Sequence, residues 1–148
     1  MSSTREQPSR ETQQVRGPGS LGERRPATIE EYRSHERPAG PGRGGLRVRG
    51  QFNVVPAPGK PLVSIVTAVY NGERFLEQAI GSVLSQTYPT IEYTVIDGGS
   101  TDRTLDIIRK YERNIALWLR ESDRGISDAF NKGIAASQGD VIGLLNAD

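Results

Sequence analysis

The feature that most constrains this chain is a regular alternation, after residue 60, of short apolar runs with longer segments of helical spacing. The apolar runs are rich in β-branched residues and leucine, as expected of strands buried on both faces. Their positions are 62–70, 91–97, 115–121 and 141–146. The alternation predicts an α/β fold in β-α-β-α-β-α-β order, with a Rossmann-like, mostly parallel sheet and right-handed crossovers that place helices on both faces.

Three segments between these runs carry the helical pattern, at 71–89, 100–111 and 125–139. The first has an apolar stripe at helical spacing and is ended by Pro89. In the second, Ser100 or Thr101 is available as the N-terminal cap. In the third, Gly139 suits the C-terminal stop, so each expected helix has a recognisable beginning or end.

The first sixty residues differ in composition from the rest. They hold eleven Lys and Arg against six Asp and Glu, together with seven of the nine prolines and nine of the seventeen glycines. Their apolar residues are sparse and follow no period, so little area can be buried to offset the entropy of ordering. We therefore expect residues 1–60 to form a disordered Arg/Gly/Pro-rich tail in front of a single domain, residues 61–148.

An arginine- and glycine-rich stretch in this tail, residues 38–50, leaves two interpretations open. Segments of this kind can follow the phosphate backbone of RNA. The stretch has no repeated Arg-Gly-Gly unit and few aromatic residues, so an arginine-rich tail that stays in solvent is favoured. We expect no specific nucleic-acid partner.

Composition also excludes several kinds of site. The chain has no cysteine, which rules out disulfides and thiolate metal sites. No apolar run reaches the roughly 18 residues of a membrane span, and the N-terminus lacks the apolar stretch of a secretory signal. We expect a cytoplasmic chain without a transmembrane segment. A full-length form could lie at the inner face of the membrane.

Polar residues follow each of the four expected strands, at the edge where parallel α/β sheets bind their ligands. The four places are 70–71, Asp97, 121–128 and 146–148, and three of them carry carboxylates. No G-x-G-x-x-G follows the first strand, no P-loop occurs, and the lysine of a phospho-receiver site is missing. A pocket of carboxylates with one aromatic suits a nucleotide whose base is read by the aromatic face and an Asp, and whose diphosphate is held through a divalent cation.

Two stretches carry a resemblance to a known family. The first, "PLVSIVTAVYNGERFLEQAIGSVLSQTYPTIEYTVIDGGSTDRTLDII", resembles the N-terminal, nucleotide-sugar-binding half of family 2 glycosyltransferases, which have the GT-A fold. The second, "SDRGISDAFNKGIAASQGDVIGLLNAD", is similar to the segment that follows it and ends in their D-x-D-type metal motif. The loop in this second stretch reads like the D-x-G-I-x-D-A-x-N-K-G of a colanic-acid or exopolysaccharide-type subgroup. The resemblance covers residues 61–148 and none of the tail.

The resemblance implies roles for residues at the first two strand ends. Tyr70 occupies the place of the aromatic that stacks on the base, and Asn71 follows it. Asp97 occupies the place of the carboxylate that accepts from the ring N–H of the base. Many relatives have a second Asp after it, where this chain has Gly98.

The loop before the third expected helix adds two further candidates. Asp123 and Asp128 match positions that flank the donor site, although either could instead cap the helix. The family pattern G-x-x-x-A-R-N-x-G is in register here except that Phe130 replaces the Arg. The resemblance therefore implies that another residue makes the contact with the diphosphate or the base that the family's Arg makes. The nearby cations are Arg124 and Lys132.

The last motif concerns the metal. In the D-x-D register Asn146 takes the first place and Asp148 the second, so Mg²⁺ or Mn²⁺ would depend on Asp148. Asn is an uncharged and weaker ligand. The resemblance places the catalytic base and the acceptor site beyond residue 148, so no residue of this chain is expected to act as the catalytic base.

The function implied is that of an inverting glycosyltransferase of hexosyltransferase type. It would move a sugar from a nucleotide-diphosphate donor, with a UDP-sugar favoured, to a glycan or lipid-linked acceptor. We expect residues 1–148 alone to have little or no transferase activity. The competing interpretation is a non-catalytic nucleotide-binding or scaffold module that keeps the half-fold, which Asn146 and the long basic tail favour.

Overall fold

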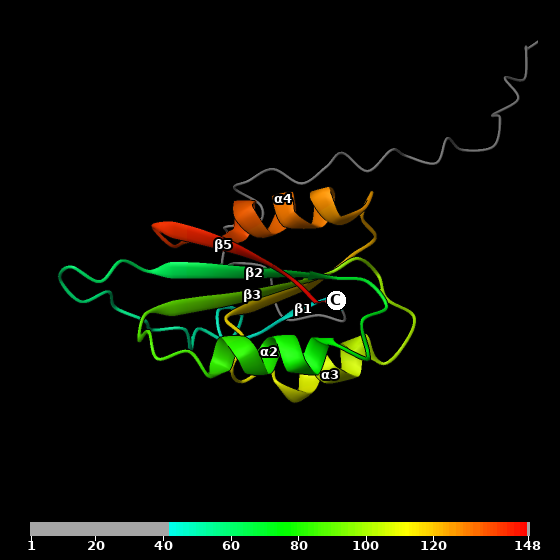
Figure 1. The fold of residues 1–148 in the computed structure, drawn as a ribbon, viewed down its shortest axis with the longest axis horizontal. Helices are drawn as coiled ribbons and strands as arrows, with labels where there is room; N and C mark the ends of the chain where they lie inside the picture. Colours follow the sequence, from blue (N-terminus) through cyan, green and yellow to red (C-terminus); the bar gives the residue numbers. More distant parts are fainter. Residues whose placement is uncertain (1–41, 148) are drawn as a thin grey trace, which may run out of the picture.

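The structure is a computed structural model that describes residues 42–147. Its centre is a five-stranded sheet in the order β1-β4-β3-β2-β5 (Figure 1). The strands are β1 (Arg43–Gly44), β2 (Val63–Val69), β3 (Ile91–Asp97), β4 (Leu117–Arg120) and β5 (Val141–Asn146). Strands β2 to β5 are parallel, and β1 pairs antiparallel with β4. The predicted mostly parallel α/β sheet is confirmed.

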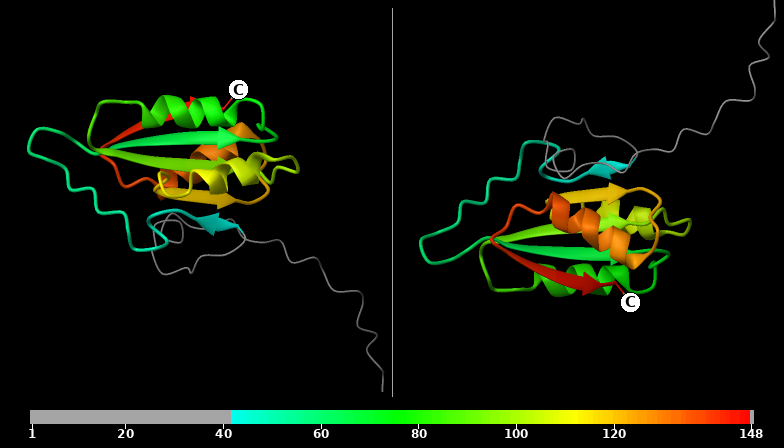
Figure 2. Two further views of the ribbon diagram at one scale, coloured as in Figure 1. Left: turned by 90° about the horizontal axis from the view of Figure 1, so that it is seen from below. Right: turned by 90° about the horizontal axis from the view of Figure 1, so that it is seen from above.

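In the described part of the chain, three helices cover the two faces of the sheet. They are α2 (Leu76–Leu84), α3 (Thr104–Lys110) and α4 (Ile126–Ala136). Helices α2 and α3 lie on one face and α4 on the other (Figures 1 and 2). Within residues 42–147, no helix has both the length and the apolar character that crossing a bilayer requires.

The core is divided by the sheet into two clusters, one under each helical layer. On the α2–α3 side, Leu76, Ile80 and Ile108 are fully buried against the sheet. On the α4 side, Val66 and Ile96 pack against the small residues of the helix, and Phe130 packs at the edge of this cluster. The apolar stripes read from the sequence therefore face the sheet from both sides, as expected of a three-layer α/β domain.

Helix α4 approaches the sheet closely because it carries a glycine at the contact. A Cβ atom added to Gly133 would overlap Cγ1 of Val66 and would lie 3.3 Å from Cγ1 of Ile96. Only glycine permits this separation, because any larger side chain would push the helix away from β2.

The caps of the second expected helix differ from the prediction. Helix α3 begins at Thr104, and its first N–H groups are served by Asp102, whose Oδ1 accepts from the Thr104 N–H at 2.9 Å. Ser100 does not cap the helix, because its hydroxyl binds Asp97 and receives the Asn71 N–H. The expectation that Ser100 or Thr101 caps α3 is therefore wrong.

Residues 43–47, inside the expected tail, are ordered against the sheet. Residues 43–44 form β1, and the backbone N–H groups of Leu46 and Arg47 donate to Ile115 and Ala116 at 3.0 and 2.8 Å. The prediction of a disordered tail is wrong for these residues, because long-range pairing supplies what local sequence does not. Residues 1–41, the rest of the expected tail, lie outside the described residues.

A buried ion pair anchors this segment to the amino-terminal end of the sheet. Nη1 of Arg47 lies 3.0 Å from Oε1 of Glu92, and both side chains are almost wholly buried. Oε2 of Glu92 accepts from the Ser64 hydroxyl at 2.5 Å and from the Gln138 N–H at 2.8 Å. Nη1 of Arg47 also donates to the Ala136 carbonyl at 2.6 Å. Burial lowers the pKa of Arg47, and the Glu92 charge acts in the opposite direction.

The first prediction concerns this pair. Arg47→Ala leaves the Glu92 carboxylate buried without its cation, so the free energy of unfolding should fall by about 3–5 kcal/mol. Arg49→Ala is the matched control, because Arg49 pairs with Glu112 at the surface and exposed pairs contribute about 1 kcal/mol or less. Urea unfolding, followed by the fluorescence of Trp118, the single tryptophan, measures the free energy of unfolding of both variants. Equal losses in the two variants would show that the pair does not anchor the segment.

Candidate functional site

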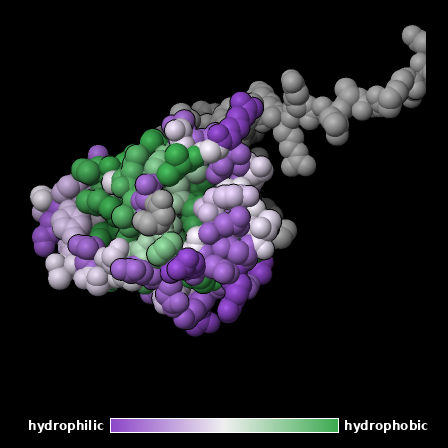
Figure 3. Space-filling model, turned by 45° about the vertical axis from the view of Figure 1, so that its right-hand side comes forward, coloured by the Kyte–Doolittle hydropathy of each residue, from purple (hydrophilic) through white to green (hydrophobic). Residues whose placement is uncertain are grey.

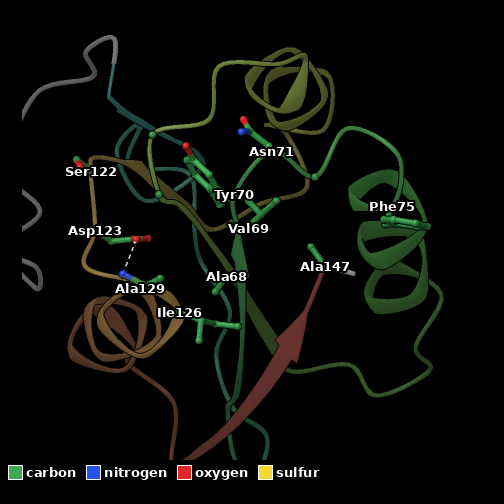
Figure 4. Close-up of a pocket in the computed structure, with 14 residues that line it drawn as sticks. Ala68, Val69, Tyr70, Asn71, Phe75, Ser122, Asp123, Ile126, Ala129 and Ala147 are labelled. Atoms are coloured by element: carbon green, nitrogen blue, oxygen red, sulfur yellow. Dashed lines mark hydrogen bonds between the residues drawn. The ribbon is translucent and has the colours of Figure 1, made fainter.

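A pocket of about 660 Å³ opens at the carboxyl-terminal ends of the parallel strands (Figure 4). Its wall comes from four parts of the chain: residues 68–72 after β2, the 98–99 turn after β3, the 122–126 loop with the first turn of α4, and Ala147 after β5. Its size lies in the range of small-molecule and cofactor sites. The predicted convergence of strand ends is therefore present in the fold.

Strand register brings these ends level with one another. Val69 of β2 pairs with Asp97 of β3, which in turn pairs with Arg120 of β4. On the other side, Ala68 pairs with Asn146 of β5. Because all four strands are parallel and end at nearly the same height, their loops meet over one edge of the sheet.

Apolar side chains lie exposed at the pocket. Tyr70 is 64% exposed and Ile126 51% exposed, and both line the pocket. On the side where the strand ends come forward, hydrophobic side chains gather on one part of the surface with hydrophilic ones beside them (Figure 3). Large apolar side chains left in solvent beside a cavity are typical of a surface that binds a ligand.

Asn71 joins the turn after β2 to the turn after β3. Its backbone is left-handed, with φ of 50°, a conformation that Asn tolerates better than most residues. Its N–H donates to the Ser100 hydroxyl at 2.8 Å, and its Oδ1 accepts from the Thr101 N–H at 2.8 Å. Asn71 therefore lines the pocket and also fixes the spacing of two of its walls.

Asp97 lies beneath the pocket and does not line it. Its side chain is fully buried, and its Oδ1 accepts from the Ser100 N–H at 2.9 Å and from the Ser100 hydroxyl at 2.5 Å. Its Oδ2 lies 3.2 Å from Nε of Arg120. The carboxylate is thus committed to the base of the β3–α3 turn and to the end of β4.

Asp123 lines the pocket from the loop before α4 and points toward its centre (Figure 4). Its Oδ1 accepts from the Gly125 N–H at 2.9 Å. The carboxylate lies directly against Gly98, because a Cβ atom on Gly98 would overlap it and stand 2.9 Å from Cγ of Asp123. Asp123 and Gly98 therefore share one small volume at the pocket wall.

Asp128 is placed away from the pocket, on the first turn of α4. Its Oδ2 accepts from the Arg124 N–H at 3.2 Å and pairs with Nζ of Lys132 at 3.4 Å. Its slight burial acts to raise the pKa, but the Arg124 N–H and the Lys132 charge outweigh it, so the pKa lies below its ordinary value. The arrangement is that of a helix cap.

The two cations considered as replacements for the missing Arg do not line the pocket. Nζ of Lys132 lies 3.2 Å from Oε1 of Glu121 and donates to the Ser122 carbonyl at 3.1 Å. Lys132 therefore holds the loop before α4 in place. Phe130, the residue in the Arg position, packs at the edge of the core.

The end of β5 leads into the pocket, because Ala147 forms part of its wall. Asp148, the expected metal ligand, lies outside the described residues. Across residues 42–147, no three His, Cys, Asp or Glu side chains are grouped in a way that could hold a metal ion. Asn146, in the first place of the motif, is exposed.

Sequence reasoning missed two parts of this wall. Phe75 stands just before α2, which begins at Leu76, and is 46% exposed at the pocket. Ile126 was not singled out at all. A large apolar residue at the first position of a helix, next to a polar strand-end loop, is the signal that could have identified it.

The sequence model of glycosyl transferase family 2 matches residues 64–148, more than half of the chain. A curated relative, the putative teichuronic acid biosynthesis glycosyltransferase TuaG of Bacillus subtilis, is 37% identical over 92 residues, which is 60% of this chain and 36% of the relative. The chain spans about a third of the length of the first curated relatives that it matches.

Two solved structures show the same fold. One is a mannosyltransferase from Pyrobaculum calidifontis in complex with GDP-Man and Mn²⁺, with 26% identity and a TM-score of 0.57 over 65% of this chain and 30% of that one. The other is S. aureus TarS in complex with UDP-GlcNAc, with 25% identity and a TM-score of 0.54 over 59% of this chain and 26% of that one. With its α/β fold and its pocket at the strand ends, the chain therefore belongs to glycosyl transferase family 2 and has the fold of the GT-A glycosyltransferases.

Proposed function

We propose that the pocket binds a nucleotide-diphosphate sugar, with a UDP-sugar favoured, as the donor of a glycosyl transfer. The observation that carries this proposal is the position of an exposed aromatic and a carboxylate, Tyr70 and Asp123, in one pocket at the strand ends. The two similar structures with GDP-Man and UDP-GlcNAc support a nucleotide sugar as the ligand class.

Tyr70 stacks on the base in this proposal. Its ring is mostly exposed, so a flat ligand can cover it and remove apolar area from water. Asn71 holds the turn under the nucleotide through its bonds to the β3–α3 turn. Asp97 and Asp128 lie outside the pocket wall, so we assign them positioning roles in place of the direct contacts that the resemblance implied.

The metal would be Mg²⁺ or Mn²⁺, held by Asp148 at the point to which Ala147 leads the chain. Oxygen ligands from a carboxylate suit either ion. Such an ion supplies charge that neutralises the diphosphate as the bond from sugar to phosphate breaks. The described residues contribute binding and orientation of the donor.

The rest of the reaction is proposed from the resemblance to the family. An inverting transfer to a glycan or lipid-linked acceptor, the hexosyltransferase type, the exopolysaccharide-type subgroup and a cytoplasmic location all follow from the resemblance and stay proposals. The low activity expected of residues 1–148 alone also stays a prediction. A non-catalytic nucleotide-binding module is the second candidate, since Asn146 weakens the metal motif.

The second prediction tests the aromatic. Tyr70→Ala should weaken UDP binding, measured by calorimetric titration, by about 5- to 150-fold, because stacking of a base on an aromatic is worth about 1–3 kcal/mol. Tyr70→Phe keeps the ring and should bind UDP nearly as tightly as the wild type. Tyr111→Ala is the control, since Tyr111 bonds Glu77 away from the pocket. Unchanged affinity in Tyr70→Ala would contradict the stacking role.

The third prediction tests the metal. The wild type should bind UDP more tightly with Mn²⁺ than with EDTA, and Asp148→Ala should remove that difference while leaving the metal-free affinity unchanged. Asp106→Ala, on the exposed side of α3, is the matched control. If Mn²⁺ strengthens UDP binding equally in Asp148→Ala, the ion is held elsewhere. If the wild type binds UDP but Mn²⁺ has no effect, the non-catalytic module is favoured.

A further inference from the structure

We propose that Asp123, and not Asp97, is the carboxylate that accepts a hydrogen bond from the nucleoside part of the donor, and that Gly98 is required because it makes room for that carboxylate. The inference rests on the proposed function and deepens it. It assigns the polar recognition of the nucleoside to one pair of residues from two different strand ends.

Asp97 is unsuited to the role in this structure. Its Oδ1 accepts from Ser100, its Oδ2 faces Nε of Arg120 as an ion pair without a hydrogen bond, and its side chain has no exposed surface that a ligand could reach. To reach a ligand, the carboxylate would have to leave Arg120, which is itself only partly exposed. Breaking a buried pair is strongly unfavourable, so Asp97 is better explained as the support of the β3–α3 turn.

Asp123 has a free acceptor at the pocket wall, whereas the unbonded oxygen of Asp97 is buried beneath it. Its Oδ1 is fixed by the Gly125 N–H, which orients the carboxylate, while its Oδ2 receives no hydrogen bond from any residue in the described part of the chain. An ionised carboxylate accepts hydrogen bonds and donates none, so its ligand group must be a donor. In UDP the donors are the ring N–H of the base and the ribose hydroxyls, whereas the phosphates would be repelled.

The position of Asp123 separates it from the metal end of the pocket. In Figure 4 Asp123 and Ala147 lie on opposite sides of the cavity, with Tyr70 between and above them. The Asp123 carboxylate therefore lies across the cavity from Ala147, the last residue that the structure describes. This arrangement favours a contact with the nucleoside over a contact with the cation.

Gly98 makes this placement possible. A side chain at position 98 would occupy the space of the Asp123 carboxylate, since even its Cβ would stand 3.2 Å from Oδ1 and overlap Oδ2. The two positions therefore exclude each other: either residue 98 or residue 123 can present a carboxylate at this point. It follows that exchanging the two residue types should return a carboxylate to the same part of the pocket from the other strand end.

The experiment is a UDP titration without metal and with Mn²⁺. Asp123→Ala should weaken UDP binding by about 10- to 100-fold in both conditions, because a hydrogen bond to a charged group is lost. Gly98→Ala should weaken it comparably, although the change adds only a methyl group. The double variant Gly98→Asp with Asp123→Gly should recover most of the affinity. Asp106→Ala is the control, and urea unfolding checks that each variant is folded.

The analogues 3-methyl-UDP and 2′-deoxy-UDP identify the donor group. The wild type should bind one of them more weakly than UDP, and Asp123→Ala should no longer distinguish that analogue from UDP. Sensitivity to the 3-methyl group assigns the ring N–H, and sensitivity to the missing hydroxyl assigns the ribose.

Three results would overturn the inference. Wild-type affinity in Asp123→Ala would show that the carboxylate makes no contact. A loss confined to the Mn²⁺ condition would make Asp123 a metal ligand. Weaker UDP binding in Asp97→Asn at unchanged stability, with Asp123→Ala unaffected, would return the role to Asp97. Absence of UDP binding by the folded wild type is a separate result, because it removes the proposed function itself.

Discussion

The buried ion pair between Glu92 and Arg47 is the interaction on which the rest of the structure depends. The Glu92 carboxylate joins a cation from the segment before β2, a hydroxyl on β2 and a backbone N–H from the α4–β5 connection. A charge so deeply buried is unfavourable unless it is paired and fully bonded, and here each oxygen has a partner. The contact therefore fixes the relative positions of three chain segments that are distant in sequence.

This anchoring takes place at the amino-terminal ends of the strands, and the pocket lies at the opposite ends. The separation matters because polar groups that hold the fold together are unavailable to a ligand. Beside the pocket, too, the groups that hold the fold differ from the groups that face the cavity. Asp97 is buried against Ser100 and Arg120, while Asp123 lines the pocket and keeps one oxygen free. A carboxylate that supports the fold and one that faces the pocket are thus neighbours with different environments.

Much of this could be predicted from sequence. The four apolar runs gave the parallel strands, and their polar ends gave the place of the pocket, because both depend on local patterns that a sheet of this kind obeys. The strand at Arg43–Gly44 could not be predicted, since it is held by pairing with Leu119 and Trp118, far along the chain, and follows no apolar period of its own. Nor could the sequence distinguish the half-buried Asp123 at the pocket wall from the fully buried Asp97, because side-chain environment is set by contacts across the fold.

Gly133 shows how the size of the pocket could change in evolution without a change in the residues of its wall. It lies one helical turn beyond Ala129, touches no part of the pocket, and carries no functional group, but it sets how near α4 comes to β2. The same helix supports Ile126 and follows the Asp123 loop, so its height above the sheet also determines the depth of the cavity. A substitution there would act as a spacer, changing the size of the cavity while leaving every residue of its wall unaltered.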